Sequence, residues 1–190
     1  MKKAKAPYLL ALAAAMALTI PCAVTLTSCD DDDNKSAWEQ YADWREENQQ
    51  WVTQQAALRD PSGNLLFTAY TPTWAPSSTV YIRFLNDTTQ TRDNLRPYYT
   101  STTTVNYTVH LYNGTRVDSA ANYTGSLNNQ GLIDGWSMAI TQMHVGDSIE
   151  AIMPYNIAYG VSGMGNDVPP FSALRFNIRL TDIPGYVVRP

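Results

Sequence analysis

Four segments in the second part of the chain carry apolar residues at every second position. They are residues 80–84, 105–111, 149–153 and 174–180. Because successive side chains of a strand point to opposite faces, each segment predicts a strand with one buried and one wet face, as is typical of antiparallel sheets. Asn113-Gly114 follows the second segment and precedes Thr115-Arg116-Val117, which predicts a hairpin. The chain is therefore expected to fold around one antiparallel sheet.

One short helix is expected among these strands. A helix over residues 134–142 would bring Trp136 and Ile140 to one side, together with Met143 just after it, which is the spacing of a helix rather than of a strand. Residues 86–104 are rich in threonine with scattered charges, which indicates a long connection between two strands. Together these patterns predict a single α+β domain over residues 61–190, in which a sheet faces one short helix.

A longer helix is predicted over residues 36–58, before this domain. Ser36 and Glu39 have the spacing of a capping box, and Asp60-Pro61-Ser62-Gly63 forms a turn that ends the N-terminal segment 36–60. One face of the helix is apolar and carries Trp38, Tyr41, Trp44, Trp51 and Leu58. We expect this face to dock on the domain that follows. A surface for a dimer or another partner is the alternative.

The first 28 residues have the pattern of a secretory signal peptide. Three lysines at positions 2, 3 and 5 precede an uncharged apolar run from Tyr8 to Leu26. An uncleaved anchor helix is the competing interpretation, although Pro21 argues against an uninterrupted helix. Leu26-Thr27-Ser28-Cys29 resembles the bacterial lipobox. That resemblance implies that the signal is removed before Cys29 and that the thiol of Cys29 is lipidated, which would attach the chain to a membrane.

Four consecutive aspartates, residues 30–33, follow this cysteine. Adjacent carboxylates repel one another and stay solvated, so residues 29–35 are predicted to form a flexible acidic tether. The run also resembles the acidic export signal that some Gram-negative groups place after a lipidated cysteine. We therefore expect a location in the cell envelope, lipid-anchored to the outer membrane, on its periplasmic or its surface side.

Charge and composition exclude several kinds of function. The chain has 13 basic and 17 acidic residues and a formal net charge of −4, and removal of residues 1–28 changes that charge to −7 because three lysines and no acid are lost. Such a chain lacks the basic surface that nucleic acids require. Cys22 leaves with the signal and Cys29 is committed to lipid, so no thiol remains as a nucleophile. With only two histidines, we expect no metal and no cofactor.

From Val105 onward, six stretches resemble the FKBP-type peptidyl-prolyl cis-trans isomerase family in order and in spacing. They read VNYT (105–108), LYNGTRVDS (111–119), LIDGW (132–136), MHVGD (143–147), IAYG (157–160) and VPPFSALRFNI (168–178). The resemblance implies an α+β fold, an FKBP-like antiparallel sheet wrapped on one short helix, here with an added N-terminal helix. Residues 70–100 would supply the first strands of that sheet and a long connection.

The resemblance also implies a site. In the family, an apolar pocket between the sheet and the short helix receives a proline ring. Trp136 would form its floor, Tyr107 and Phe176 its walls, Asp118 a buried-edge carboxylate, and the Tyr159 hydroxyl would meet a peptide carbonyl. The predicted catalytic residues are thus Tyr107, Asp118, Trp136, Tyr159 and Phe176. The predicted further substrate-binding residues are Val117, Leu132, Ile133 and Ile157.

Some positions depart from the family's pattern. Val117 stands where the family usually has a phenylalanine, and Ile157 replaces a frequent tyrosine. Tyr123 is the one residue of the stretch 120–130 that offers itself for an aromatic position of the family. Loss of a ring at Val117 removes contact area from the pocket, so we expect weaker isomerase activity than is usual in the family.

The predicted function is peptidyl-prolyl cis-trans isomerisation that assists the folding of exported proteins, with proline-containing polypeptides as partners. The first alternative is a chaperone-like module that binds proline-containing segments with negligible turnover. The second is a surface lipoprotein that uses the helix of residues 36–58 to join an oligomer or another partner.

Overall fold

The computed structural model describes residues 35–186. The predicted signal peptide, Cys29 and nearly all of the predicted tether lie outside these residues. Within residues 35–186, no helix combines the length and the apolar character needed to cross a bilayer.

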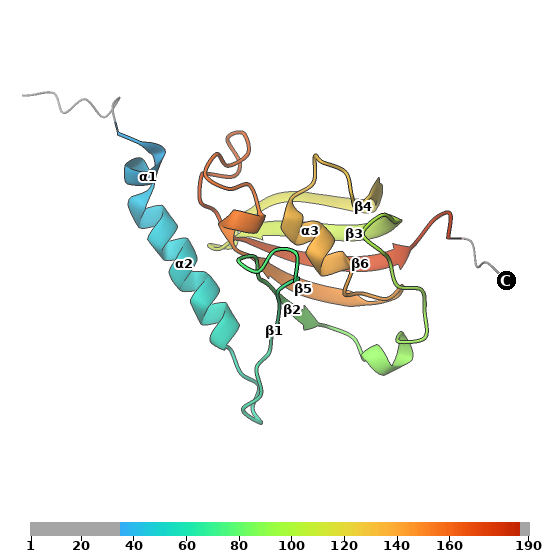
Figure 1. Cartoon of the computed structure of the whole chain (residues 1–190). Coiled ribbons are helices and arrows are strands. Elements are labelled where there is room, and N and C mark those ends of the chain that lie inside the picture. Colours follow the sequence, from blue (N-terminus) through green and yellow to red (C-terminus); the bar gives the residue numbers. More distant parts are fainter. Residues whose placement is uncertain (1–34, 187–190) are drawn as a thin grey trace, which may run out of the picture. The chain divides into compact units, whose positions relative to one another are not determined.

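Six antiparallel strands form one sheet in the order β1-β2-β5-β6-β3-β4 (Figure 1). The strands are β1 (Thr68–Tyr70), β2 (Val80–Phe84), β3 (Thr102–Leu111), β4 (Arg116–Ser126), β5 (Ser148–Met153) and β6 (Leu174–Asp182). The four predicted strands and the hairpin at Asn113-Gly114 are present. The wet face predicted for residues 149–153 is wrong, because β5 lies inside the sheet and is buried on both faces from Ile149 to Met153. β1 has only three residues and thus no readable period, and β4 is a long edge strand without a fully buried residue.

The short helix predicted near residue 134 is α3, Asp134–Ile140, and it lies against the sheet (Figure 1). Its residues 135–140 are all buried. Gly135 is what allows this approach, because a Cβ there would lie 2.7 Å from Met153 Sδ and 3.0 Å from the Ile157 carbonyl oxygen. Two 3-10 turns complete the domain, η2 at Thr88–Gln90 and η3 at Tyr155–Ile157. The core therefore lies between α3 and the sheet.

The N-terminal segment forms two helices, α1 (Ala37–Gln40) and α2 (Ala42–Ala57). The predicted capping box is present, since the Ser36 and Glu39 side chains each accept a hydrogen bond from the other's backbone N–H. Tyr41, with φ −105° and ψ 25°, interrupts the helix between its two parts. Sequence periodicity predicted one continuous helix because a single non-helical residue leaves the spacing of the apolar residues nearly unchanged.

The α2 helix docks on the chain's own domain through specific hydrogen bonds. Trp44 Nε1 donates to Ser172 Oγ at 3.1 Å. Asn48, only 1% exposed, accepts from the Ala173 N–H at 2.8 Å through Oδ1 and donates to the Trp44 carbonyl at 2.7 Å through Nδ2. The predicted docking thus uses a buried polar residue besides the aromatic face, and Leu58 at the end of that face is 40% exposed. The dimer-surface alternative stays a prediction.

Replacement of Asn48 by alanine is expected to lower the free energy of unfolding by about 1–3 kcal/mol, because the Ala173 N–H is then buried without its acceptor. Urea denaturation followed by circular dichroism measures this change. Gln54→Ala, at an exposed position of the same helix, is the control and is expected to stay within about 0.5 kcal/mol of the unaltered chain. Equal stability of the two variants would contradict this role of Asn48.

Candidate active site

A cavity of about 110 Å³ lies beside the N-terminal end of α3, against β3, β4 and β6. It is somewhat smaller than the roughly 150 Å³ cavity that accommodates a benzene ring in an engineered protein core, which suits a small saturated ring. Its lining consists of Tyr107, Val109, Asp118, Tyr123, Gly131, Leu132, Ile133, Trp136, Tyr159 and Phe176. The cavity therefore gathers residues that lie far apart in the sequence.

Aromatic rings hold Trp136 in place within this cavity. Its indole meets the rings of Tyr107, Tyr123 and Phe176 at centroid distances of 5.2, 6.1 and 5.7 Å, with interplanar angles of 82°, 82° and 67°. These are edge-to-face contacts, which aromatic quadrupoles favour over face-to-face stacking. Trp136 and Phe176 are each 4% exposed, so they form the deep part of the cavity.

A hydroxyl–carboxylate pair lies at one side of the cavity. The Tyr107 hydroxyl donates to Asp118 Oδ2 at 2.6 Å, and Asp118 Oδ1 accepts the Ser119 N–H at 2.7 Å. Burial, and then the hydrogen bond to Asp118, raise the pKa of Tyr107 well above its ordinary value. Asp118 itself is exposed on the edge strand β4, whereas the resemblance implied a buried-edge carboxylate.

Tyr159 lies far from this pair in the sequence, in the turn that follows η3, and it is half-buried. Burial, and then the charge of Asp118, raise the pKa of Tyr159 above its ordinary value, so its phenol stays protonated at neutral pH. No group within residues 35–186 forms a hydrogen bond with this hydroxyl. The cavity thus contains one phenol that is engaged by a carboxylate and one that is available to an incoming acceptor.

The cavity brings together seven of the nine residues predicted for the pocket. Val117 and Ile157 do not line it. Ile157 is 1% exposed and packs in the core, with its carbonyl directed at Gly135. Val117 is half-buried and packs against the core, and it is smaller than the aromatic ring that the family usually has in that position.

Three lining residues were not among the predicted site residues. They are Val109, Tyr123 and Gly131. Tyr123 had a signal in the sequence, since it is the available aromatic residue of the stretch 120–130. Val109 follows the alternation of β3 and could have been found by continuing from Tyr107 along the same face. Gly131 contributes no side chain and gave no signal.

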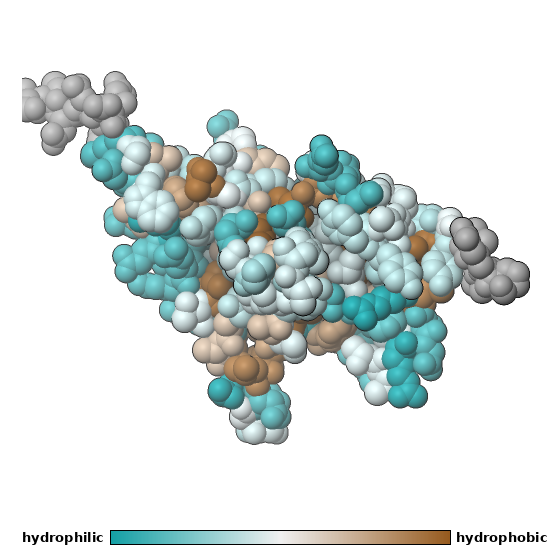
Figure 2. All heavy atoms as spheres, viewed as in Figure 1, coloured by the Kyte–Doolittle hydropathy of each residue, from teal (hydrophilic) through white to brown (hydrophobic). Residues whose placement is uncertain are grey.

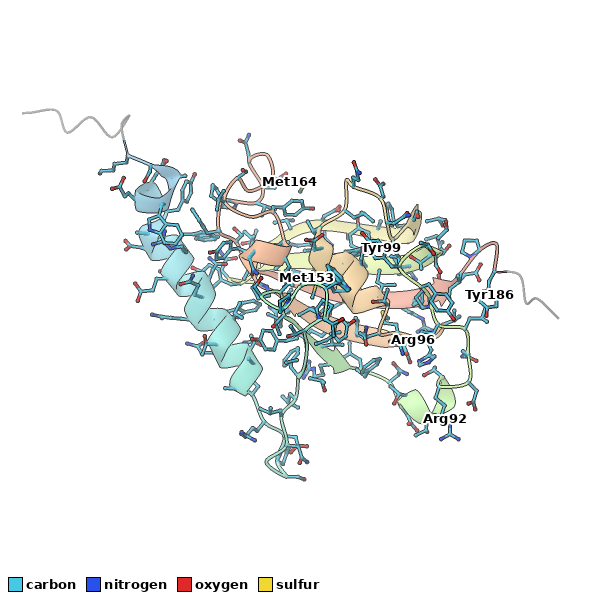
Figure 3. All side chains as sticks on the ribbon, in the orientation of Figure 1. Arg92, Arg96, Tyr99, Met153, Met164 and Tyr186 are labelled. Carbon is cyan, nitrogen blue, oxygen red and sulfur yellow. The ribbon has the colours of Figure 1, made fainter. Side chains whose placement is uncertain are left out.

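A larger cavity of about 470 Å³ lies along the C-terminal half of α3, and its lining includes Tyr70 and Met138. Arg96 and Tyr99, which are labelled in Figure 3, also line it. Its rim is open to solvent, with Trp74 64% and Tyr98 72% exposed. The face of the molecule shown in Figure 2 carries mainly hydrophilic and intermediate residues, with small scattered hydrophobic areas. We regard the smaller cavity as the candidate site because the buried rings of Trp136 and Phe176 form its deep part and because Tyr107, Asp118 and Tyr159 place hydrogen-bonding groups along it.

No group of three or more His, Cys, Asp or Glu side chains within residues 35–186 is arranged to hold a metal ion. The candidate site is lined by aromatic rings, aliphatic side chains, two phenol hydroxyls and the Asp118 carboxylate.

Comparison with known proteins gives a consistent result. A family model described as FKBP-type peptidyl-prolyl cis-trans isomerase matches residues 95–181. The chain is 39% identical over 89 residues to the FKBP-type 22 kDa peptidyl-prolyl cis-trans isomerase of Escherichia coli, which covers 46% of this chain and 43% of that protein. It is 30% identical over 86 residues to FK506-binding protein 1A of Emericella nidulans, which covers 43% of this chain and 80% of that protein.

The fold has solved counterparts. A peptidyl-prolyl cis-trans isomerase from Pseudomonas syringae pv. tomato superposes with a TM-score of 0.62 at 19% identity, covering 75% of this chain and 95% of that one. The predicted α+β fold, with an FKBP-like sheet and one short helix, is thereby confirmed. The chain spans less than half the length of the Escherichia coli relative but four fifths of the Emericella nidulans protein. The family model, these identities and this fold together show that the chain belongs to the FKBP-type peptidyl-prolyl cis-trans isomerase family.

Proposed function

We propose that this chain catalyses cis-trans isomerisation of peptide bonds that precede proline, in the cavity lined by Trp136. The observation that carries the proposal is a ring-sized cavity lined by Tyr107, Trp136 and Phe176, with the unengaged hydroxyl of Tyr159 at its side. Leu132 and Ile133 complete the apolar lining. Proline is the suitable residue because its cis form lies only about 0.5–1 kcal/mol above the trans form.

The reaction needs no nucleophile, because no covalent bond breaks. The barrier to rotation, about 18–20 kcal/mol, comes from the resonance that makes the amide planar. The planar amide separates charge more than the twisted amide does, so a dry aromatic environment disfavours the planar ground state relative to the twisted state. A roughly thousandfold acceleration requires only about 4 kcal/mol of this difference.

Hydrogen bonds then hold one side of the peptide while the other side rotates. In the proposed complex, the Tyr159 hydroxyl donates to a peptide carbonyl. The Ile133 N–H at the start of α3 is a second donor, since no acceptor within residues 35–186 engages it. The Tyr107 hydroxyl is already engaged by Asp118, so this pair shapes the wall of the cavity and orients the ring of Tyr107 against Trp136.

We further propose that the chain works in the cell envelope and assists the folding of exported, proline-containing proteins. The basic and apolar leader of residues 1–28 and the lipobox-like Leu26-Thr27-Ser28-Cys29 support export and a lipid anchor at Cys29 in the outer membrane. The aspartates of residues 30–33 support a solvated tether between this anchor and the domain. These residues lie outside the described part of the chain.

One observation favours a second candidate function, a chaperone-like module that binds proline-containing segments with slow turnover. Val117 does not reach the cavity, so one wall lacks the ring that the family usually has there. A wider pocket holds the proline ring less firmly, which weakens the selective stabilisation of the twisted amide more than it weakens binding. The two functions differ only in turnover, and the same assay separates them.

Replacement of Trp136 by alanine is expected to lower kcat/KM at least about tenfold, because the indole supplies the floor of the cavity and truncation of such an aromatic anchor removes well over 1.4 kcal/mol of contact. A protease-coupled assay on a proline-containing peptide measures the change. Trp136→Phe is tested beside it, because it keeps a ring in the core and separates loss of the site from loss of the fold.

Trp74→Ala is the matched control for this experiment, since it removes the same side chain from an exposed position beside the other cavity. Its kcat/KM is expected to be unchanged. If the unaltered chain isomerises the peptide no faster than buffer does while the peptide still binds, the isomerase function is refuted and the binding module remains.

The pH dependence of the reaction provides a separate test of Tyr159. Burial and the charge of Asp118 raise the pKa of this phenol, so it remains a protonated donor at every pH below the ordinary tyrosine value of about 10. We expect kcat/KM to stay level between about pH 7 and pH 9, and Tyr159→Phe to lower it by a constant factor over this range. An activity that falls within this range in the unaltered chain but not in Tyr159→Phe would contradict the assignment.

A further inference from the structure

The backbone of Phe171 has an uncommon conformation. Its φ is 62°, a left-handed value that is a genuine outlier for a bulky side chain, and the residue is only 1% exposed. Such a conformation persists only where surrounding contacts determine it, and it is found disproportionately at functional sites. Phe171 belongs to the connection between β5 and β6, which also carries Tyr159 and is marked in Figure 3 by Met164.

On one side, Phe171 holds both ends of the turn that contains Tyr159. Its N–H donates to the Gly160 carbonyl at 2.9 Å, and its ring meets the ring of Tyr155 edge-on, with centroids 5.4 Å apart. The turn itself is closed by the Gly160 N–H, which donates to the Tyr155 carbonyl at 2.9 Å. Tyr159 therefore stands between two residues that both contact Phe171.

On its other side, Phe171 contacts the N-terminal helix. The Trp38 ring meets the Phe171 ring edge-on at a centroid distance of 5.5 Å. Arg45 fixes Trp38, because its guanidinium lies 3.5 Å from the centre of the indole and donates to the Trp38 carbonyl at 2.6 Å. The same guanidinium lies 5.4 Å from the Phe171 ring.

Three consecutive residues, Phe171 to Ala173, each contact the N-terminal segment. Ser172 accepts a hydrogen bond from the Trp44 indole, and Ala173 donates to Asn48. Figure 1 shows this connection extending toward α1 and the first turns of α2. The N-terminal helix thus holds three consecutive residues, and the first of them holds the turn of Tyr159.

We infer that Trp38 and Phe171 are positioning residues for Tyr159, so that docking of the N-terminal helix sets the position of the hydroxyl that meets the substrate. This inference rests on the proposed function, in which Tyr159 donates to a peptide carbonyl. Trp38 is 53% exposed, so its removal opens no cavity in the core. The helix is therefore a working part of the site, connected to it through one ring-to-ring contact and one hydrogen bond.

A double-mutant cycle on the full chain tests the inference. Trp38→Ala is expected to lower kcat/KM about threefold to tenfold, the range of one hydrogen bond whose geometry is lost, and Trp38→Phe to retain most of the activity because a ring edge still reaches Phe171. In the Tyr159→Phe background, Trp38→Ala is expected to have no further effect, since the hydroxyl it positions is absent.

Trp51→Ala is the matched control. It removes the same side chain from the same N-terminal segment, at a position in α2 rather than α1. Trp51 lies near Arg175 rather than near Phe171, and we expect unchanged kcat/KM. An equal loss from Trp38→Ala with and without the Tyr159 hydroxyl would overturn the inference, because it would reveal a general effect on the folded fraction.

A second measurement separates this inference from the proposed function. NMR spectra of ring-labelled tyrosine report the surroundings of Tyr159 whether or not the chain turns over substrate. The Tyr159 resonance is expected to shift in Trp38→Ala and to stay in place in Trp51→Ala. If the unaltered chain shows no turnover but the Tyr159 resonance still shifts in Trp38→Ala, the isomerase function is refuted and the positioning role is not. An unchanged Tyr159 resonance in Trp38→Ala refutes the positioning role.

Discussion

The burial of α3 against the sheet is the constraint on which the rest of the structure depends. Every residue from 135 to 140 is buried, and the approach is so close that position 135 has no room for a side chain without movement of Met153. This packing fixes the direction of Trp136. Because Tyr107, Tyr123 and Phe176 then meet the indole by their edges or at steep angles, space remains beside it, and this space is the candidate site.

The two phenols of the site illustrate how one residue type takes two roles. Both are partly buried, and burial is the main reason that the pKa of each is raised. The Tyr107 hydroxyl donates a hydrogen bond to the Asp118 carboxylate on the edge strand β4, so Tyr107 forms part of the wall. Tyr159 also feels the charge of Asp118 but forms no hydrogen bond with it, so the Tyr159 hydroxyl remains available to donate to a ligand. The difference lies in the hydrogen-bond partner rather than in the side chain.

Much of the sheet could be predicted from the sequence because its central strands carry apolar residues at every second position. β6 follows the period of two, and β2 follows it from Val80 to Arg83. β5 is buried on both faces from Ile149 to Met153, so its period could be seen only in the spacing of its apolar residues. β1 is too short to have a period, and β4 pairs with one neighbour only, so few of its positions needed to be apolar. Most of the site followed from motifs in shared register, with Val117 and Ile157 as the exceptions.

What the sequence could not indicate are contacts between distant residues. The burial of Asn48 depends on an N–H donated by Ala173, and no local pattern distinguishes it from the exposed glutamines beside it. The left-handed backbone of Phe171 is likewise determined by the rings of Trp38 and Tyr155. Both features arise from tertiary structure that overrides local preference. They also join the N-terminal helix, predicted as a separate segment, to the rest of the domain.

The docking of α2 has a consequence for the order of events during synthesis. Its hydrogen bonds to Ser172 and Ala173 join residues that are 128 and 125 positions apart. A chain is made from its N-terminus, and an isolated helix of this length is only marginally stable in water. The α2 helix can therefore dock only after the chain has been extended by a further 125 residues or more. Phe171, which holds the turn of Tyr159, and Phe176, which lines the cavity, are made at this same late stage. The site is therefore complete only once β6 has been made.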